Sequence, residues 1–420
     1  MAAAGVGGTN TTVVDVLVIG AGAAGLTAAY DLTRQNVSFQ ILEAASFLGG
    51  RLKKVESANF ATSFPIDAGG EWIHVDPRIL NTIVNDDDGV EETIHVETFP
   101  FKPMFSYRDG GEWAEEPWFL DNDHKFKGYT WFDFFNDFIA IDEVTSKITY
   151  DCQATNVDTI STTTTIANNA SKTVPEQDTV AMVTCADGRQ WTATHAVIVT
   201  VPLKALQDNV ITFTPTLPSA TSNAIARIEW ASGIKVFLKF TTKFYRDAFS
   251  LENNSVGGDE RFFYNAAIGQ DTHDEHILGV FLMGPQADAY VDLSDDEIVA
   301  ILLADLDTAY GNVIATSSLI SSHVQNWNRQ PFIGGAYTAS ARERDINTLR
   351  EVVVENTIVF AGEAIPDDGN SYQWGFVHGA ALSGRRAANL AIGMINGTEN
   401  GVGSSRLSLL VYLILGWLMM

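Results

Sequence analysis

The sequence is poor in cysteine and in basic residues. Cys152 and Cys185 are the only cysteines among 420 residues. Two cysteines form neither a disulfide framework nor a cysteine-rich metal site, so we expect a fold that does not depend on an oxidising compartment. Lys and Arg number 26 against 52 Asp and Glu, which gives a net charge of −26. Because phosphate-backbone binding requires clustered Lys and Arg, we expect no nucleic-acid partner.

Long hydrophobic runs are also scarce. Residues 1–12 are small and polar, without the basic start and apolar stretch of a secretory signal. The one long run is 407–420, which carries no charge. As a helix it would span about 21 Å, short of the roughly 30 Å hydrocarbon core. We therefore expect a cytoplasmic protein, and three interpretations of 407–420 stay open: a short membrane tail anchor, a helix docked on the body, or a poorly ordered apolar end.

Charge and aromatic side chains are concentrated in one segment. Residues 81–160 hold 18 acidic and 5 basic residues, together with Trp113, Trp118 and Trp131. Acidic and aromatic groups together bind organic cations. The segment is therefore a candidate for recognising a cationic substrate, and the alternative is a solvated acidic face over an aromatic core.

The start of the chain has a strand–glycine–helix pattern. Residues 13–19 predict a buried strand, 23–35 an Ala-rich helix and 37–42 a second strand, which together form a parallel βαβ unit. The turn between the first strand and the helix reads G-x-G-x-x-G, and Glu43 ends the second strand. In this context the glycines allow a tight turn and close approach of a pyrophosphate, while the carboxylate accepts from ribose hydroxyls. The pattern predicts a dinucleotide site.

Strand patterns recur near both ends of the chain, with a helix predicted over 375–392. This arrangement predicts an α/β, Rossmann-like domain assembled from separate pieces, with a second domain of mixed sheet and helices. The predicted domain boundaries are 13–76, 148–214 and 352–398 for the dinucleotide domain, 77–147 and 215–351 for the substrate domain, and 399–420 for the tail. A Thr/Asn-rich stretch at 159–173 is predicted as a loop or hairpin tip, and 352–360 as a strand.

Several motifs, in order, resemble those of the flavin-containing amine oxidase family, in particular polyamine oxidases. They are E-A-x-x-x-x-G-G-R at 43–51, G-x-x-W-I-H at 69–74, a hairpin at 184–206 ending in T-V-P-L, F-A-G-E at 360–363 and G-F-V-H-G-A at 375–380. The resemblance implies bound FAD. It also implies that the FAD is noncovalent, because Ala336 stands where members with covalent flavin carry Cys.

The resemblance further assigns residues that contact FAD. These are Gly20, Gly22, Ala24, Gly25, Glu43, Gly49, Gly50, Arg51, Gly70, Glu71, Trp72, Val157, Trp327, Gly362, Glu363, Gly375 and Phe376. Gly375 opens a predicted helix whose N–H groups could stabilise charge that develops on the flavin.

The reaction centre is assigned on the same basis. Lys235 lies in an alternating strand at 232–240 and resembles the family's lysine that holds a water at the flavin N5; the alternative is a surface lysine on an edge strand. Tyr337 and Phe376 occupy the positions of two rings that flank the substrate amine, with Phe376 replacing the commoner Tyr. His74 either contacts a second amine of a longer substrate or is a core histidine.

The resemblance implies oxidation of a polyamine-like amine by hydride transfer to flavin N5, giving an imine, then an aldehyde and an amine, with H2O2 formed from O2. Other interpretations stay open: a flavin desaturase, an L-amino-acid oxidase using Arg329 or Arg261, or a non-catalytic FAD-binding scaffold. Between Phe119 and Gly128 the chain is shorter than in the family, which usually has additional helices lining the substrate cavity there. The sequence does not determine the oligomeric state.

Overall fold

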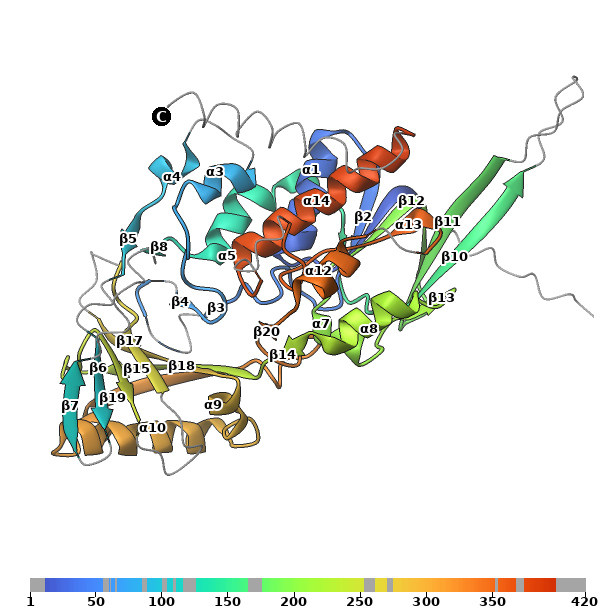
Figure 1. Cartoon of the computed structure of the whole chain (residues 1–420). Coiled ribbons are helices and arrows are strands. Elements are labelled where there is room, and N and C mark those ends of the chain that lie inside the picture. Colours follow the sequence, from blue (N-terminus) through green and yellow to red (C-terminus); the bar gives the residue numbers. More distant parts are fainter. Residues whose placement is uncertain are drawn as a thin grey trace, which may run out of the picture.

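Two large sheets organise the protein (Figure 1). The computed structural model describes residues 12–55, 60, 62–64, 66–84, 89–99, 104–108, 111–115, 126–164, 176–252, 261–269, 275–351, 354–367 and 374–397, and the structural statements below concern these residues. Residues 399–420, and with them the predicted apolar tail, lie outside this part of the chain. So do 116–125, which include most of the region between Phe119 and Gly128 that we expect to be shorter than in the family.

The first sheet has eight strands in the order β13-β10-β11-β12-β1-β2-β9, with β21 also pairing β12. Its strands are β1 (Thr12–Ile19), β2 (Phe39–Leu42), β9 (Ile148–Thr149), β10 (Ala154–Thr164), β11 (Glu176–Cys185), β12 (Gln190–Val199), β13 (Thr212–Thr214) and β21 (Ile358–Phe360). β1 pairs in parallel with β12 and β2. The second half of β1 is buried on both faces of the sheet. Val16 and Val18 belong to one core cluster, and Leu17 and Ile19 belong to another.

Two helices cover one face of this sheet. α1 (Ala23–Arg34) follows β1, and α14 (Val377–Ile395) packs against α1 (Figure 1). The helices approach closely because Gly384 has no side chain: a Cβ there would lie 2.0 Å from the Ala24 carbonyl oxygen. The predicted Rossmann-like unit is thereby confirmed, including the joining of the two ends of the chain around one sheet.

The second sheet has seven strands in the order β19-β15-β18-β17-β16-β6-β7. They are β6 (Phe105–Arg108), β7 (Glu112–Glu115), β15 (Gly233–Phe240), β16 (Ala248–Leu251), β17 (Arg261–Asn265), β18 (His276–Met283) and β19 (Leu319–Asn326). α10 (Asp295–Tyr310) packs Ile298, Leu302 and Leu306 against one face of the sheet (Figure 1). Along β15, Ile234, Val236 and Leu238 belong to the same core, and Lys235, Phe237 and Lys239 alternate with them, as predicted.

Short elements complete the fold. The strands are β3 (Lys54–Val55), β4 (Ile66–Asp67), β5 (Val96–Thr98), β8 (Phe126–Gly128), β14 (Glu229–Trp230) and β20 (Thr338–Ser340). The helices are α3 (Ile79–Val84), α4 (Val90–Thr93), α5 (Trp131–Phe134), α6 (Asp142–Thr145), α7 (Leu203–Gln207), α8 (Ser219–Arg227), α9 (Pro285–Asp288), α11 (Ile314–Ser318), α12 (Glu343–Arg350), α13 (Val354–Thr357) and a π-helical turn, η2 (Phe135–Ile139). Nowhere in the described ranges is a helix both long and apolar enough to cross a membrane.

Two local predictions differ from the structure. In the described part of the predicted strand at 352–360, Val354–Thr357 form a short helix, α13, and only Ile358–Phe360 form a strand, β21, which pairs with β12. Cys152 and Cys185, which we expected to form no disulfide framework, are joined by a disulfide. Composition could not show this pairing, because the hairpin register of β10 and β11 brings the two cysteines together. The predicted domain boundaries stay a prediction.

Candidate functional site

A cavity of about 1220 Å³ is lined by residues from both sheets. Pockets for drug-sized ligands measure about 300–1,000 Å³, so this cavity has room for a dinucleotide and a small substrate together. Its wall includes the glycine-rich turn after β1, segment 69–75, residues of β15, segment 327–339 and the start of α14. One continuous space therefore connects the predicted dinucleotide site with the predicted reaction centre.

The dinucleotide end is formed by the turn between β1 and α1. Gly25 faces the turn, where a Cβ would lie 2.0 Å from the Gly20 carbonyl oxygen, so only glycine lets helix and strand pack this closely. Glu43, at the end of β2, accepts from the Ala21 N–H at 2.7 Å and the Ala45 N–H at 2.8 Å. Burial raises the pKa of Glu43, and the backbone N–H donors oppose that shift. The carboxylate is thus held in place beside the turn.

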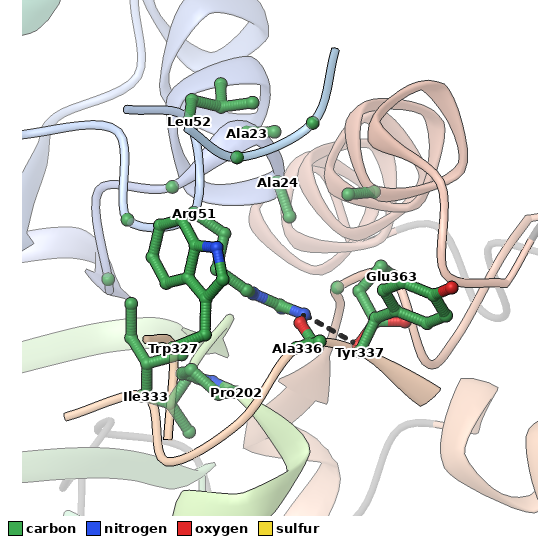
Figure 2. A pocket seen from close by; sticks show the side chains of 18 of the residues that line it. Ala23, Ala24, Arg51, Leu52, Pro202, Trp327, Ile333, Ala336, Tyr337 and Glu363 are labelled. Atoms are coloured by element: carbon green, nitrogen blue, oxygen red, sulfur yellow. Dashed lines mark hydrogen bonds and ion pairs between the residues drawn. The ribbon is translucent and has the colours of Figure 1, made fainter. Parts of the chain in front are cut away.

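Arg51 occupies the middle of the cavity wall. Its Nη1 donates to the Ala336 carbonyl oxygen at 2.8 Å and to a Glu363 carboxylate oxygen at 3.1 Å. Its guanidinium carbon also lies 5.0 Å from the centre of the Trp230 ring. Figure 2 shows the side chain extending across the cavity toward Ala336 and Glu363. A positive group is therefore fixed beside the space that a dinucleotide would occupy.

Glu363 ties this arrangement to the start of α14. Its carboxylate accepts from the Gly375 N–H at 3.0 Å and from the Thr338 N–H at 3.4 Å. Tyr337 directly precedes Thr338 in the chain, and it lines the cavity. Burial, and then the charge of Glu363, raise the pKa of Tyr337 to about 12, so its phenol stays neutral near pH 7.

The Lys235 side chain is buried, with a relative exposure of 3%. β15 pairs with β18 on one side and β19 on the other, so the interpretation of Lys235 as an exposed edge-strand lysine is wrong. The Nζ atom donates to the Asp67 carbonyl oxygen at 3.1 Å, to the Gly69 carbonyl oxygen at 2.8 Å and to Glu71 Oε2 at 2.6 Å. Tyr264 on β17 also donates to Glu71 Oε2, at 2.5 Å.

Two acids and a phenol share this buried network. Burial, and then the charge of Glu71, raise the pKa of Asp67 well above its usual range. Burial, and then Glu71, likewise raise the pKa of Tyr264. Burial thus works against the charged form of Asp67, and the ion pair of this network joins Glu71 and Lys235.

The chamber beside Lys235 is largely aromatic. Phe376 lies with its ring centre 4.6 Å from that of His74 and is stacked on His378 at 5.3 Å. His74, Tyr337 and Phe376 all line the cavity, together with Trp72, Phe262, Phe281, Met283 and Trp374. Tyr337 packs against Gly375, where a Cβ would approach its ring at 3.2 Å. These rings offer an apolar, polarisable surface to a substrate.

The structure brings most of the predicted residues together. All four predicted catalytic residues line the cavity, and so do the predicted cofactor contacts apart from Gly25 and Val157. The resemblance assigns the backbone of Val157 to the adenine; Val157 lies near the start of β10, and its side chain is fully buried in the core of the first sheet. The residues that line the cavity here are Cys152, Gln153 and Ala154, at the start of that strand.

Some lining residues carried no sequence signal. Phe262 on β17 and Phe281 on β18 are register partners in the second sheet. Two alternating strands predict a face, but only their register shows which residues meet at a cavity. Trp374 stands directly before the helix predicted over 375–392. Its position next to the G-F-V-H-G-A motif was the only signal in the sequence that could have indicated it.

The candidate arginines of an amino-acid oxidase lie elsewhere. Arg261 is buried, where it contacts Asp305 and donates to Tyr290 Oη at 3.1 Å. Arg329 pairs with Asp295 at 3.2 Å. Among the described lining residues, Arg51 is the only arginine. No acidic residue of the described part of 81–160 lines the cavity.

Comparisons with known proteins identify a family. The sequence model of a family described as "Flavin containing amine oxidoreductase" matches residues 159–392, and that of an NAD(P)-binding Rossmann-like domain matches residues 18–85. Peroxisomal N(1)-acetyl-spermine/spermidine oxidase of Homo sapiens is 28% identical over 233 residues, 49% of this chain and 44% of that protein. Polyamine oxidase 4 of Oryza sativa subsp. japonica is 31% identical over 214 residues, 49% of this chain and 41% of that protein. The matches thus span less than half of these relatives' length.

Solved structures show the same fold. Cyclohexylamine oxidase from Brevibacterium oxydans IH-35A superposes with a TM-score of 0.70 at 18% identity, over 90% of this chain and 99% of the other. A putrescine oxidase with a redesigned cofactor site gives a TM-score of 0.64 at 17% identity, over 91% and 99%. At such identities the likeness extends to the fold, a Rossmann-like domain combined with a mixed-sheet domain.

Proposed function

Because the chain belongs to the flavin-containing amine oxidoreductase family, whose sequence model covers more than half of it, we propose that it oxidises an amine with bound FAD. The observation that carries the proposal is the single cavity joining the glycine-rich turn to the aromatic chamber. When bound, FAD would supply the two-electron acceptor for a hydride lost from the substrate α-carbon, with O2 as the final oxidant that gives H2O2. Water hydrolyses the imine product to an aldehyde and an amine.

The residues at the dinucleotide end fit FAD. The start of α1 presents free N–H groups to a pyrophosphate. A carboxylate has about four acceptor positions, so Glu43 keeps acceptor positions for ribose hydroxyls beyond its two backbone contacts. Attachment is noncovalent in this proposal, since Ala336 offers no nucleophile and the two cysteines are bonded to each other.

The aromatic chamber would hold and desolvate the amine. Tyr337 and Phe376 present rings to the cavity, and the neutral phenol of Tyr337 adds no charge. Taking an isolated ammonium out of water is costly, so such a chamber favours the neutral form of the amine, which is the form that loses hydride. The chain's part is to orient the substrate and to exclude water.

More specifically, we propose that the amine is a polyamine-like compound. The names of the two curated relatives support it. The acidic segment at 81–160 lends it less support than we expected, because none of its described acidic residues lines the cavity. A monoamine with an apolar body is the second candidate, favoured by the rings of Trp72, Phe262 and Phe281.

Peroxide release in air tests the proposal and separates these candidates. We would incubate the FAD-loaded protein with spermine, spermidine, cyclohexylamine and an L-amino acid at two ionic strengths. Peroxide from any amine supports the proposal. A polyamine whose kcat/KM falls with added salt supports electrostatic capture, whereas turnover of the monoamine alone favours the apolar alternative. Absence of peroxide with every compound would favour a desaturase or a non-catalytic scaffold.

A further inference from the structure

The disulfide holds one stretch of wall at the dinucleotide end of the cavity. The Cα atoms of Cys152 and Cys185 are 5.3 Å apart, within the range that disulfides require. Cys152 and the two residues that follow it, Gln153 and Ala154, line the cavity, whereas Cys185 is not among the described lining residues. The bridge therefore ties this stretch of cavity wall to the end of β11.

The same part of the chain supports Glu43, the proposed ribose ligand. The Glu43 N–H donates to the Thr149 carbonyl oxygen at 2.9 Å, and the Cys152 N–H donates to the Glu43 carbonyl oxygen at 2.8 Å. The Asp151 N–H donates to the Ala45 carbonyl oxygen at 3.1 Å. Residues 149–152 thus run alongside the end of β2, so a change in their position would also move the backbone that carries the Glu43 carboxylate.

The bridge is buried on the core side of this segment. Cys152 and Cys185 are 1% and 2% exposed, and both belong to the core of the first sheet. Of the two, Cys152 is the one that the cavity reaches. A small reductant would therefore approach the bridge through the space that FAD would fill.

We propose that the Cys152–Cys185 bridge is a redox-active site coupled to cofactor binding. The chain with the intact bridge binds FAD more tightly than the chain with two thiols, and bound FAD in turn protects the bridge from reduction. The reductant is a small dithiol: the protein S–S bond breaks, an S–S bond forms in the reductant, and its two thiol protons end on Cys152 and Cys185. The inference rests on the proposed function for the identity of the cofactor.

Conformational entropy gives the direction and size of the effect. Without the bridge, part of the wall at 149–154 must be ordered when FAD binds, and fixing the backbone of one further residue costs about tenfold in affinity. Coupling between two equilibria is reciprocal, so FAD must favour the disulfide by the same factor. A reducing environment would then lower the fraction of the chain that carries FAD.

The first test compares FAD affinity in the two redox states. The dissociation constant is measured by flavin fluorescence for the oxidised parent, for the parent fully reduced by dithiothreitol, and for Cys152→Ala/Cys185→Ala. Alkylation and mass spectrometry confirm the thiol content, and circular dichroism confirms that each sample is folded. We expect a dissociation constant about tenfold higher in the reduced parent and in the double variant than in the oxidised parent. Values within about twofold of the oxidised parent in both would overturn the proposal.

Two controls separate the bridge from other effects. Dithiothreitol should not change the dissociation constant of the double variant, which has no bridge to reduce. Arg189→Met loosens the same segment from outside, because the exposed Arg189 side chain donates to the Tyr150 carbonyl oxygen at 3.3 Å. It should leave FAD affinity unchanged in the oxidised state. An equal loss in oxidised Arg189→Met would overturn the assignment of the effect to the bridge.

The second test measures the reverse effect. The parent is equilibrated in mixtures of oxidised and reduced dithiothreitol, with and without saturating FAD, and its thiols are counted after alkylation. A tenfold difference in FAD affinity requires a midpoint potential about 30 mV more negative with FAD. Equal midpoints would overturn the proposal. Neither test uses an amine, so a protein that oxidises no amine would refute the proposed function while these measurements still decide the coupling.

Discussion

Arg51 joins two segments 312 residues apart, because its Nη1 donates to a Glu363 carboxylate oxygen at 3.1 Å. The same nitrogen donates to the Ala336 carbonyl oxygen, so one side chain connects the segment after the dinucleotide turn, the segment before β20 and the segment after β21. In the proposed enzyme these contacts would fix the positive charge of Arg51 at the wall of the cavity that holds FAD.

Replacing Arg51 should therefore weaken FAD binding. Arg51→Met removes the ion pair with Glu363 and the positive charge beside the dinucleotide. We expect the dissociation constant for FAD, measured by flavin fluorescence, to rise at least tenfold, a change of about 1.4 kcal/mol.

A matched arginine controls for general destabilisation. Arg189 pairs with Asp187 at 2.5 Å and lies over the Trp191 ring at 5.6 Å, but does not line the cavity. Arg189→Met should leave FAD affinity unchanged. Equal losses in both variants would contradict a specific role for Arg51.

Glu43→Gln should also reduce FAD affinity. The carboxylate accepts from two backbone N–H groups, at Ala21 and Ala45, and an amide can accept at only one of its two ends. Leaving a buried donor unsatisfied costs about 1–3 kcal/mol, so the turn itself should be disturbed. Titration with FAD should show a loss of about tenfold or more.

Asp307 provides the comparison for Glu43. Its carboxylate accepts from the Ala315 N–H at 2.7 Å and the Thr316 N–H at 3.3 Å, and Asp307 does not line the cavity. Asp307→Asn should lower the melting temperature without changing FAD affinity. If it changes affinity as much as Glu43→Gln does, the ribose role of Glu43 is unsupported.

Asp67 should make stability depend on pH. Its pKa in the folded protein is raised, chiefly by burial, so the unfolded chain releases this proton first as pH rises. The free energy of unfolding therefore falls from about pH 3.9 upward until the folded pKa is passed, by about 1.4 kcal/mol per pH unit. Asp67→Asn, a neutral analogue, removes this loss.

Chemical denaturation at several pH values measures the effect. The free energy of unfolding of Asp67→Asn should rise relative to that of the parent as pH rises from about 4 to 8, because the asparagine side chain does not titrate. Asp142→Asn, at an exposed position on α6, should give no such gain. A constant difference between Asp67→Asn and the parent at every pH would show that Asp67 ionises normally.

The disulfide should stabilise the hairpin next to the cavity. Cys152 lines the cavity, and its N–H donates to the Glu43 carbonyl oxygen at 2.8 Å. Cross-linking residues 33 apart contributes about 2–4 kcal/mol in the chain-entropy account. A phosphine reductant should lower the denaturation midpoint of the parent and leave Cys152→Ala/Cys185→Ala unaffected. Complete reduction of the parent disulfide with no change in the midpoint would contradict this.

The sequence predicted the local geometry of the proposed dinucleotide end because its determinants are close in the chain. The turn at Gly20–Gly25 and the carboxylate of Glu43 lie within one βαβ unit, where spacing alone fixes the geometry. The motif at 360–363 likewise placed Glu363, although its contact with Arg51 required the tertiary structure.

The sequence named the residues of the proposed reaction centre, but it did not show which residues they contact. Alternation along β15 placed Lys235 on one face, yet its partner Glu71 comes from a loop 164 residues earlier. No periodicity encodes such a pair, and the same is true of the disulfide, whose partners meet through hairpin register. At Val157 the predicted contact fell within a strand, and the cavity is reached by the residues that begin that strand.

The most direct test of the account is anaerobic reduction of the bound flavin. The purified, FAD-loaded protein is mixed without O2 with spermine, spermidine, a simple monoamine and an L-amino acid in turn, and the visible flavin absorbance is recorded. We predict that at least one amine bleaches the flavin band and that the L-amino acid does not, because no described arginine except the engaged Arg51 lines the cavity. A flavin that binds stoichiometrically and is bleached by none of the amines would contradict the proposed function.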